Sequence, residues 1–349
     1  MNVLIVRLGA LGDIIHAVPA AAALRDAWPD ARIDWLVDGR HREIVDLVTG
    51  LDRIIALEGG TIAGWAEAVR TLRQVRYDWA VDFQGLLKSA VLGRASGAAR
   101  VAGFSIWHLR EKTARPFYTD PPPPEDPLRR GPPSQGDLLR RGHRGEGHVI
   151  RKNLGLLRTL GIDDERIVFP LAPVDSVALG AIRATLGSDR RFALINAGAA
   201  WPNKRWIPER FGAVAAFLLE VCELPSFVLW GPGEGPLAQA VVEASEGAAR
   251  LCPPTSLTDI LALCRAAALM ISGDTGPLHI ATAAGTPTVS VFGPTDPARN
   301  GPWDPRDPAV SRFASCRCPY RRRCREADWC MADIPTSEVT AAVQQRLER

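Results

Sequence analysis

The sequence predicts an α/β protein of two doubly wound domains, each with a parallel sheet, facing each other across a cleft. Short apolar runs, typical of buried parallel strands, alternate with helical patterns over most of the 349 residues. That length is more than a single core comfortably holds. A proline-containing stretch at 171–176 is the best linker candidate. We therefore expect domains at 1–170 and 177–330, and a terminal helix within 331–349 for which packing against the first domain is one option.

Composition excludes several classes of protein. A hydrophobic content of 46% and a charged content of 23% are typical of soluble globular chains. The formal net charge of +3 is too weak to indicate a nucleic-acid partner. No apolar run approaches transmembrane length, and the first residues form a strand pattern without a basic leader. We expect a cytoplasmic protein with no transmembrane segment and with its seven cysteines reduced.

The first half alternates strands and helices and then departs from the pattern. Strands are predicted at 3–8, 33–37, 54–57, 79–83 and 101–104, and helices at 14–27, 62–74, from 84–89 onward, and at 149–160. Residues 120–148 contain seven prolines and almost no aliphatic periodicity, which predicts an exposed irregular excursion. It is interpreted either as a tolerated insertion or as a mobile flap over a binding site.

A glycine turn follows the first strand and ends in Asp13. Its glycines, Gly9 and Gly12, are spaced G-x-x-G, so the dinucleotide fingerprint G-x-G-x-x-G is absent and a dehydrogenase is disfavoured. Asp13 has two compatible interpretations. It is a helix N-cap, which typically contributes about 1 kcal/mol, or a carboxylate at a strand's carboxyl end that acts as a general base.

Lys88 is expected in the first turn of a helix that follows the fourth strand. A cation is not favoured there by the helix dipole. A solvated lysine is the default interpretation, and a lysine directed at an anionic substrate is the alternative.

The second half is organised around residues 271–279, Ile-Ser-Gly-Asp-Thr-Gly-Pro-Leu-His. A buried strand at 268–271 leads into Gly273, and Asp274 and Thr275 are residue types that cap the helix that follows. The free N–H groups near Gly276 and the helix dipole predict an anion site. An ordinary capped helix is the alternative interpretation.

Two further loops in this half follow predicted strands. The strand at 192–196 leads into small residues and Lys204, a point charge suited to a phosphate, although a surface turn is the simpler interpretation. The strand at 227–230 leads into a glycine turn with Glu234, which is either a ribose ligand or a helix N-terminal acid. Further elements are predicted at 288–292, a strand, and at 339–347, a helix.

Four cysteines lie close together near the end of the chain, at Cys316, Cys318, Cys324 and Cys330. Such a group raises the question of zinc, but the paired C-x-x-C spacing of structural zinc sites is absent. Reduced structural thiols are the favoured interpretation, with no metal expected.

Four blocks of the sequence resemble, in the same order, those of the bacterial lipopolysaccharide heptosyltransferases, glycosyltransferase family 9. They are RLGALGDI at 7–14, DFQGLLKS at 82–89, NKRW at 203–206 and GDTGPLH at 273–279. The second block and the pair Arg110–Glu111 most resemble type I members of the family. The cysteine tail resembles type II members more, and Ala199 and Ala200 replace hydroxyl residues found in type I.

The resemblance implies a GT-B fold and an inverting, metal-independent transfer of heptose from ADP-heptose, with no cofactor. The acceptor implied is a Kdo or inner-core sugar on lipid A at the inner-membrane surface. Roles are implied for the following residues: Asp13 as general base; Lys204 in catalysis and at the donor phosphates; Asp274 at the donor sugar; Thr275, Gly276 and His279 in the diphosphate loop; Glu234 at the ribose; Arg7, Gln84, Lys88 and Arg110 on the acceptor side.

Two other functions remain as alternatives. A GT-B-like sugar-nucleotide epimerase would consume an ADP-sugar without an acceptor. A non-catalytic nucleotide-binding module would bind ADP and transfer nothing.

Overall fold

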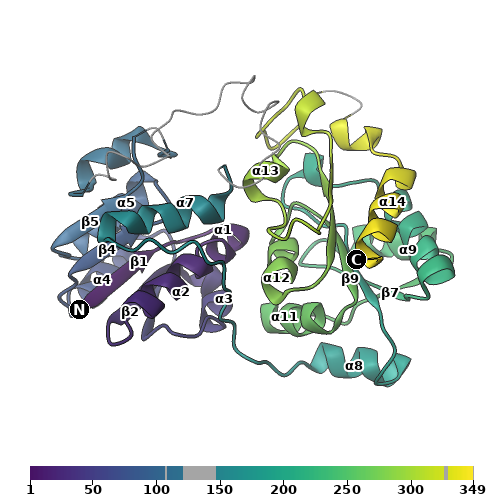
Figure 1. The fold of residues 1–349 in the computed structure, drawn as a ribbon, viewed down its shortest axis with the longest axis horizontal. Coiled ribbons are helices and arrows are strands. Elements are labelled where there is room, and N and C mark those ends of the chain that lie inside the picture. Colours follow the sequence, from purple (N-terminus) through teal and green to yellow (C-terminus); the bar gives the residue numbers. More distant parts are fainter. Residues whose placement is uncertain (107, 121–146, 326–328, 349) are drawn as a thin grey trace. The chain divides into compact units, whose positions relative to one another are not determined.

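The computed structural model describes residues 1–106, 108–120, 147–325 and 329–348. Most of the proline-rich excursion, residues 121–146, lies outside this described part. The chain divides into two compact units, Met1–Ala172 (unit 1) and Pro173–Arg349 (unit 2), with the boundary inside the expected linker. Each unit is an α/β layer structure with helices against a parallel sheet (Figure 1).

Unit 1 is built on a five-stranded parallel sheet in the order β3-β2-β1-β4-β5. Its strands are β1 (Asn2–Val6), β2 (Arg32–Asp38), β3 (Arg53–Leu57), β4 (Trp79–Asp82) and β5 (Arg100–Gly103). Its α-helices are α1 (Leu11–Ile15), α2 (Val18–Ala27), α3 (Arg42–Asp46), α4 (Ile62–Leu72), α5 (Leu87–Ala95) and α7 (Val149–Leu156). All five predicted strands are present, each within two residues of its expected ends. The helix expected at 149–160 ends as a 3₁₀ turn at Leu157–Leu160, and Gly161 stops it at φ 81°.

Unit 2 contains a six-stranded parallel sheet in the order β11-β10-β9-β6-β7-β8. Its strands are β6 (Ala193–Asn196), β7 (Ser226–Leu229), β8 (Ala249–Leu251), β9 (Leu269–Gly273), β10 (Thr288–Phe292) and β11 (Ala309–Ser311). Its α-helices are α8 (Val177–Leu186), α9 (Pro208–Cys222), α10 (Gly235–Ala244), α11 (Leu257–Ala266), α12 (Gly276–Ala284), α13 (Pro297–Asn300) and α14 (Thr336–Leu347).

The two sheets share one strand order. In chain order, unit 1 runs 3-2-1-4-5, and unit 2 runs 3-2-1-4-5 with β11 added as a sixth strand. Successive strands are added to one side of the first strand and then to its other side. This change of direction falls between β1 and β4 in unit 1, and between β6 and β9 in unit 2. At such a switch point the loops after the two central strands diverge and leave a crevice at the carboxyl edge, where ligands of open α/β sheets bind.

The helix expected at 14–27 is two helices, α1 and α2, because Pro19 begins a new helix near its own first turn. Asp13 therefore lies in the first turn of α1 and is not the N-cap. Ala10 occupies that position and makes no side-chain cap. The capping interpretation of Asp13 was wrong, whereas an acid in the first turn still matches the helix dipole.

The last helix belongs to unit 2 by its contacts. α14 packs against α9, β10 and β11, and it buries Val339 and Val343 in the core shared with Trp206. The Trp206 indole N–H donates to the Ile334 carbonyl at 3.0 Å. These contacts make the terminal helix part of the core of unit 2.

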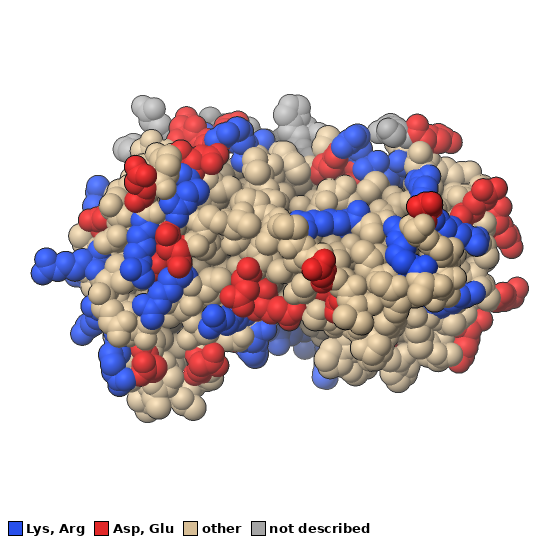
Figure 2. All heavy atoms as spheres, turned by 90° about the horizontal axis from the view of Figure 1, so that it is seen from below, with Lys and Arg blue, Asp and Glu red and all other residues tan. Residues whose placement is uncertain are grey.

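Surface charge is mixed where it is visible. On the face drawn in Figure 2, Lys and Arg side chains are interspersed with Asp and Glu. Within the described residues, no helix is both long enough and apolar enough to cross a membrane.

A buried carboxylate organises the loop after β4. Asp82 is fully buried and accepts hydrogen bonds from the Tyr118 hydroxyl at 2.7 Å and the Ser89 hydroxyl at 2.8 Å. Its other oxygen accepts from the Gln84 and Gly85 backbone N–H groups, at 2.8 and 3.3 Å. Burial raises the pKa of Asp82 and outweighs these hydrogen bonds, which favour the charged form.

We expect Asp82→Ala to lower the free energy of unfolding by about 3 kcal/mol, because it leaves several buried donors without an acceptor. Asp82→Asn should cost clearly less, since the amide oxygen still accepts from the backbone. Urea unfolding would measure both, with the exposed Asp30→Ala as control. Equal losses for Ala and Asn would contradict this role.

Candidate functional site

Two loops meet at the switch point of unit 2. The loop after β6 carries Lys204, at the end of a 3₁₀ turn (Pro202–Lys204), and the turn after β9 carries Asp274. Lys204 Nζ lies 2.5 Å from Asp274 Oδ2, and the two residues are 70 positions apart in the sequence. Lys204 Nζ also lies over the Trp201 ring, 4.6 Å from its centroid. The structure thus joins two residues that sequence patterns predicted separately.

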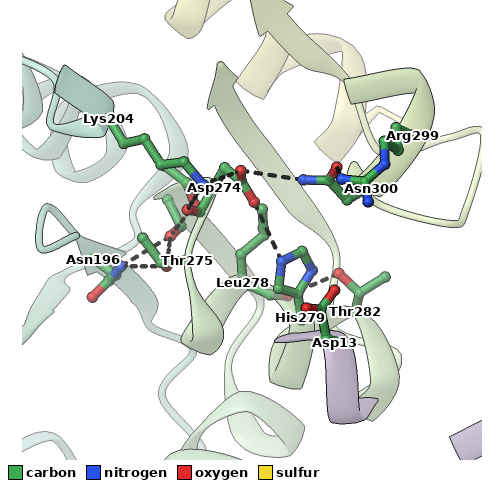
Figure 3. A network of polar contacts seen from close by, with 12 residues as sticks. Asp13, Asn196, Lys204, Asp274, Thr275, Leu278, His279, Thr282, Arg299 and Asn300 are labelled. Carbon is green, nitrogen blue, oxygen red and sulfur yellow. Dashed lines mark hydrogen bonds and ion pairs between the residues drawn. The ribbon is translucent and has the colours of Figure 1, made fainter. Parts of the chain in front are cut away.

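Asp274 is the centre of a polar network (Figure 3). It is 6% exposed. His279 Nε2 lies 3.3 Å from its Oδ1, and the Asn300 side-chain amide donates to Oδ2 at 3.2 Å. The carboxylate therefore meets donors from three separate parts of the chain: the loop after β6, the helix α12 and the helix α13.

The electrostatics of this network favour the ionised carboxylate. Burial alone would raise the pKa of Asp274, but the hydrogen bond from His279 and the charge of Lys204 outweigh it. The pKa is consequently held well below the usual range of an aspartic acid. Asp274 is therefore negatively charged at neutral pH although it is buried.

The Thr275 hydroxyl contacts the Asn196 side chain and does not cap helix α12. Thr275 occupies the N-cap position, but its side chain makes no cap hydrogen bond. Instead its Oγ1 accepts from the Asn196 amide at 2.9 Å, and the same amide donates to Ser272 Oγ at 3.0 Å. The capping role expected for this hydroxyl was wrong. Gly276 begins α12 as expected, so the first N–H groups of that helix point to the same edge of the sheet.

Glu234 lies at the carboxyl end of β7, at the N-cap position of α10. Its Oε2 accepts from the Gly231 backbone N–H at 3.0 Å. The carboxylate lies directly over Gly198, where an added Cβ would come within 2.2 Å of Glu234 Oε2. Gly198 is therefore a glycine because the Glu234 carboxylate occupies the space of a side chain.

The switch point of unit 1 gathers the residues that resemblance places on the acceptor side. Arg7 Nη2 lies 2.6 Å from Asp13 Oδ2, and Arg110 Nη2 lies 3.2 Å from the same oxygen. The Gln84 side-chain oxygen accepts from the Leu8 N–H at 2.8 Å, and the Arg7 guanidinium also donates to the Phe83 carbonyl. These bonds tie the loop after β1 to the loop after β4.

Exposure differs among these residues. Arg7 is 3% exposed and Gln84 5%, so both are largely committed to holding the two loops together. The Asp13 side chain is 19% exposed and that of Arg110 is 42% exposed. Lys88 is exposed at the start of α5. Among Arg7, Arg110 and Lys88, the last two are thus the cations more accessible to solvent.

The cysteine cluster forms in part. Cys316 Sγ lies 3.7 Å from Cys318 Sγ and 3.5 Å from Cys330 Sγ. Burial, followed by the neighbouring Cys316, raises the pKa of Cys330 to about 12, which favours a protonated thiol. Among the residues that the structure describes, no group of three or more His, Cys, Asp or Glu is arranged to hold a metal ion.

Sequence reasoning missed several partners of the predicted residues. Asn196, at the end of a predicted strand, was a polar residue at a carboxyl end and could have been noticed. Asn300 had no signal, because it is the last residue of a short helix, α13, of ordinary composition. Trp201 and Ser272 likewise gain their roles only from the packing of the two loops.

Comparison with known proteins shows the family of this chain. The sequence profile of "Glycosyltransferase family 9 (heptosyltransferase)" matches residues 141–330, more than half of the chain. The lipopolysaccharide heptosyltransferase 1 of Pseudomonas aeruginosa is 30% identical over 319 residues, which span 87% of this chain and 81% of that protein.

The chain belongs to glycosyltransferase family 9.

Other relatives of this family 9 glycosyltransferase agree. Lipopolysaccharide heptosyltransferase 1 of Escherichia coli K12 is 26% identical, covering 86% of this chain and 90% of the relative. The solved structure of the E. coli heptosyltransferase WaaC with ADP matches with a TM-score of 0.71 at 21% identity, over 99% of this chain and all of that one. E. coli ADP-heptose lipopolysaccharide heptosyltransferase II matches with a TM-score of 0.72 at 18% identity, over 100% and 99% of the two chains. The structural likeness establishes the GT-B fold.

We expect the stabilisation provided by Asp274 to depend on pH. Its folded-state pKa is lowered, so the ionised form stabilises the fold above the unfolded pKa of about 3.9, and this stabilisation is lost as the pH falls. Asp274→Asn should lower stability by about 3 kcal/mol at neutral pH, since it leaves Lys204 unpaired. Its difference from wild type should shrink as the pH approaches 3.

Thermal unfolding between neutral pH and about pH 3, below the unfolded Asp pKa, tests this prediction. The exposed Asp175→Asn in the same unit is the matched control. A difference between wild type and Asp274→Asn that stays constant over the whole pH range would show that the charge of Asp274 contributes nothing.

Proposed function

We propose that this family 9 glycosyltransferase transfers a heptose from ADP-heptose to a Kdo or other inner-core sugar of lipopolysaccharide. The reaction inverts the anomeric centre, needs no metal, and takes place at the cytoplasmic face of the inner membrane. Family membership supports the reaction class. The observation that carries the donor assignment is the network of Lys204 and Asp274 beside the N-terminus of α12, at the switch point of unit 2.

The donor assignment follows from the charges in unit 2. The diphosphate is met by Lys204 and by the first N–H groups of α12, and the sugar hydroxyls by Asp274. Glu234, at the neighbouring strand end, accepts from the ribose hydroxyls. Because Lys204 is paired with Asp274 before the donor arrives, binding divides the pair: the ammonium turns to phosphate and the carboxylate to sugar.

The chemistry assigns Asp13 the role of general base. It takes the proton of the acceptor hydroxyl, whose oxygen forms a bond to the anomeric carbon from the face opposite to the leaving group. The bond from the anomeric carbon to the diphosphate oxygen breaks, and ADP leaves with the electron pair. Lys204 and α12 stabilise the charge that develops on the diphosphate. Arg7 and Arg110 orient the base, and Gln84, Lys88 and Arg110 contact the acceptor.

Substituting the base separates chemistry from binding. We expect Asp13→Asn to lower kcat at least about a hundredfold, which is the usual contribution of a general base. Its affinity for ADP should stay near that of wild type. Mass spectrometry of a Kdo–lipid A acceptor incubated with ADP-heptose measures the transfer, and calorimetry measures ADP binding. The exposed Asp46→Asn is the control.

The same assay decides between the functions. Transfer from ADP-heptose, but not from UDP- or GDP-sugars, and its persistence in EDTA are the expected results. Consumption of ADP-heptose without acceptor would indicate an epimerase. ADP binding without any transfer would indicate a nucleotide-binding module. Full activity of Asp13→Asn would remove Asp13 as the base.

A glycine substitution tests the ribose role of Glu234. We expect Gly198→Ala to weaken ADP binding about tenfold, because the new methyl group displaces a carboxylate that makes charged hydrogen bonds. Gly180→Ala in helix α8 is a matched control, since nothing lies within 4 Å of its added Cβ. Unchanged ADP affinity in Gly198→Ala would contradict the ribose assignment.

A further inference from the structure

Two side chains share one oxygen of the Asp274 carboxylate. Lys204 Nζ lies 2.5 Å from Asp274 Oδ2, and the Asn300 amide donates to the same oxygen at 3.2 Å. They approach the carboxylate from opposite sides, Lys204 from the loop after β6 and Asn300 from the end of α13 (Figure 3). Lys204 carries a charge and Asn300 is neutral. A phosphate therefore attracts the first of these donors far more strongly than the second.

The orientation of the Asn300 amide is fixed by its two neighbours. Its Nδ2 faces the Asp274 carboxylate, and its Oδ1 accepts from Arg299 Nη1 at 3.3 Å. An ionised carboxylate can only accept a hydrogen bond and a guanidinium can only donate one, so the opposite orientation of the amide would lose both bonds. The Asn300 donor is thus directed at Asp274 by the chemistry of both partners.

The backbone that carries Asn300 is also held in place. The Asp296 side chain caps α13, and the Asp296 carbonyl accepts from the Asn300 N–H at 3.3 Å. The next N–H, that of Gly301, donates to the Pro297 carbonyl at 2.8 Å, and an added Cβ on Gly301 would come within 2.5 Å of that oxygen. Asn300 is therefore a short side chain on a tight turn, whereas Lys204 reaches the site on a flexible four-carbon stem.

Donor binding changes the partners of Asp274 unequally. A carboxylate presents about four acceptor sites, and Lys204, Asn300 and His279 use three of them. When Lys204 turns to the diphosphate, the buried charge loses its cation, and a buried charge with few partners is costly. Asn300 stays, because a neutral amide on a tight turn has little to gain from the phosphate. Two acceptor sites then become available to sugar hydroxyls.

We propose that Asn300 is a positioning residue that holds the Asp274 carboxylate for the donor sugar while the diphosphate engages Lys204. The inference rests on the proposed function and deepens it, because it divides the recognition of a nucleoside-diphosphate sugar between the two partners of one oxygen. Lys204 responds to the phosphate, and Asn300 keeps the carboxylate in place for the sugar hydroxyls. Asn300 itself touches neither part of the donor.

Calorimetry with ADP and with ADP-heptose tests the proposal without any acceptor. We expect Asn300→Ala to weaken the binding of ADP-heptose about tenfold, the usual effect of losing a hydrogen bond to a charged group, and that of ADP less than about twofold. Asn300→Asp should weaken the binding of both ligands, because a second carboxylate beside Asp274 would hold Lys204 away from the phosphate.

Kinetics of the full chain give a second readout that a merely structural role would not move. In Asn300→Ala the KM for ADP-heptose should rise about tenfold while kcat stays within about threefold, as expected when a contact of equal strength in the ground and transition states is removed. A structural defect would instead lower the active fraction, and hence kcat, at unchanged KM. Gln239→Ala, which removes an exposed amide elsewhere in unit 2, is the control. Thermal midpoints would show that each variant is folded.

The outcomes separate this inference from the proposed function. Equal losses of ADP and ADP-heptose affinity in Asn300→Ala, no loss of either, or a lower kcat at unchanged KM would each overturn the role of Asn300. A wild type that binds ADP-heptose no more tightly than ADP would overturn that role together with the sugar contact of Asp274. A wild type that transfers nothing, but whose preference for ADP-heptose over ADP falls about tenfold in Asn300→Ala, would remove the proposed function and support the role of Asn300.

Discussion

The strand order of the two sheets is the constraint on which the rest of the structure depends. Within each unit, the first strand of that unit lies at the centre of the sheet and the fourth lies beside it. Between these two strands the direction in which successive strands are added to the sheet reverses. The loops after these two strands are therefore the ones that meet at the carboxyl edge. This places Asp13 beside the loop of Gln84 in unit 1, and Lys204 beside Asp274 in unit 2. In both units, the same strand order brings residues that are far apart in the sequence next to each other.

Much of this could be predicted from the sequence, and the remainder depended on tertiary contacts. Buried parallel strands are continuous apolar runs, so nearly all longer strands were predicted within two residues. The short strands β8 and β11 were missed, because three residues carry too little pattern. The split of the first helix followed from Pro19, a local signal that was overlooked.

Side-chain roles were harder to predict than elements. Asp274 and Lys204 were identified from their positions after strands, but their pairing needed the strand order, which no local pattern contains. Thr275 has the residue type of a cap, yet Asn196 competes for its hydroxyl from a neighbouring strand. Asn300 reaches Asp274 from a short helix that the sequence did not mark. In each case a partner from another strand or loop overrode the local preference.

The two switch points use charge in a similar way. A carboxylate is held by cations before any ligand is present: Asp274 by Lys204, and Asp13 by Arg7 and Arg110. Each of these contacts fixes the position of a carboxylate at the carboxyl edge of its sheet. Such buried ion pairs contribute little net stability to the folded state, because the free energy of removing the charges from water offsets most of their attraction.

The hydrogen bonds between the loop of Lys204 and a much later segment affect the order in which the protein folds. Trp206 donates to the carbonyl of Ile334, and Trp329 donates to that of Arg205, so residues beside Lys204 are held by residues 128 and 124 positions away in the sequence. Unit 1 contains all of its own strands and can fold while translation continues. The Lys204 loop can make these contacts only after Ile334 has been synthesised. On the ribosome, unit 1 can therefore be folded while the Lys204 loop still lacks them.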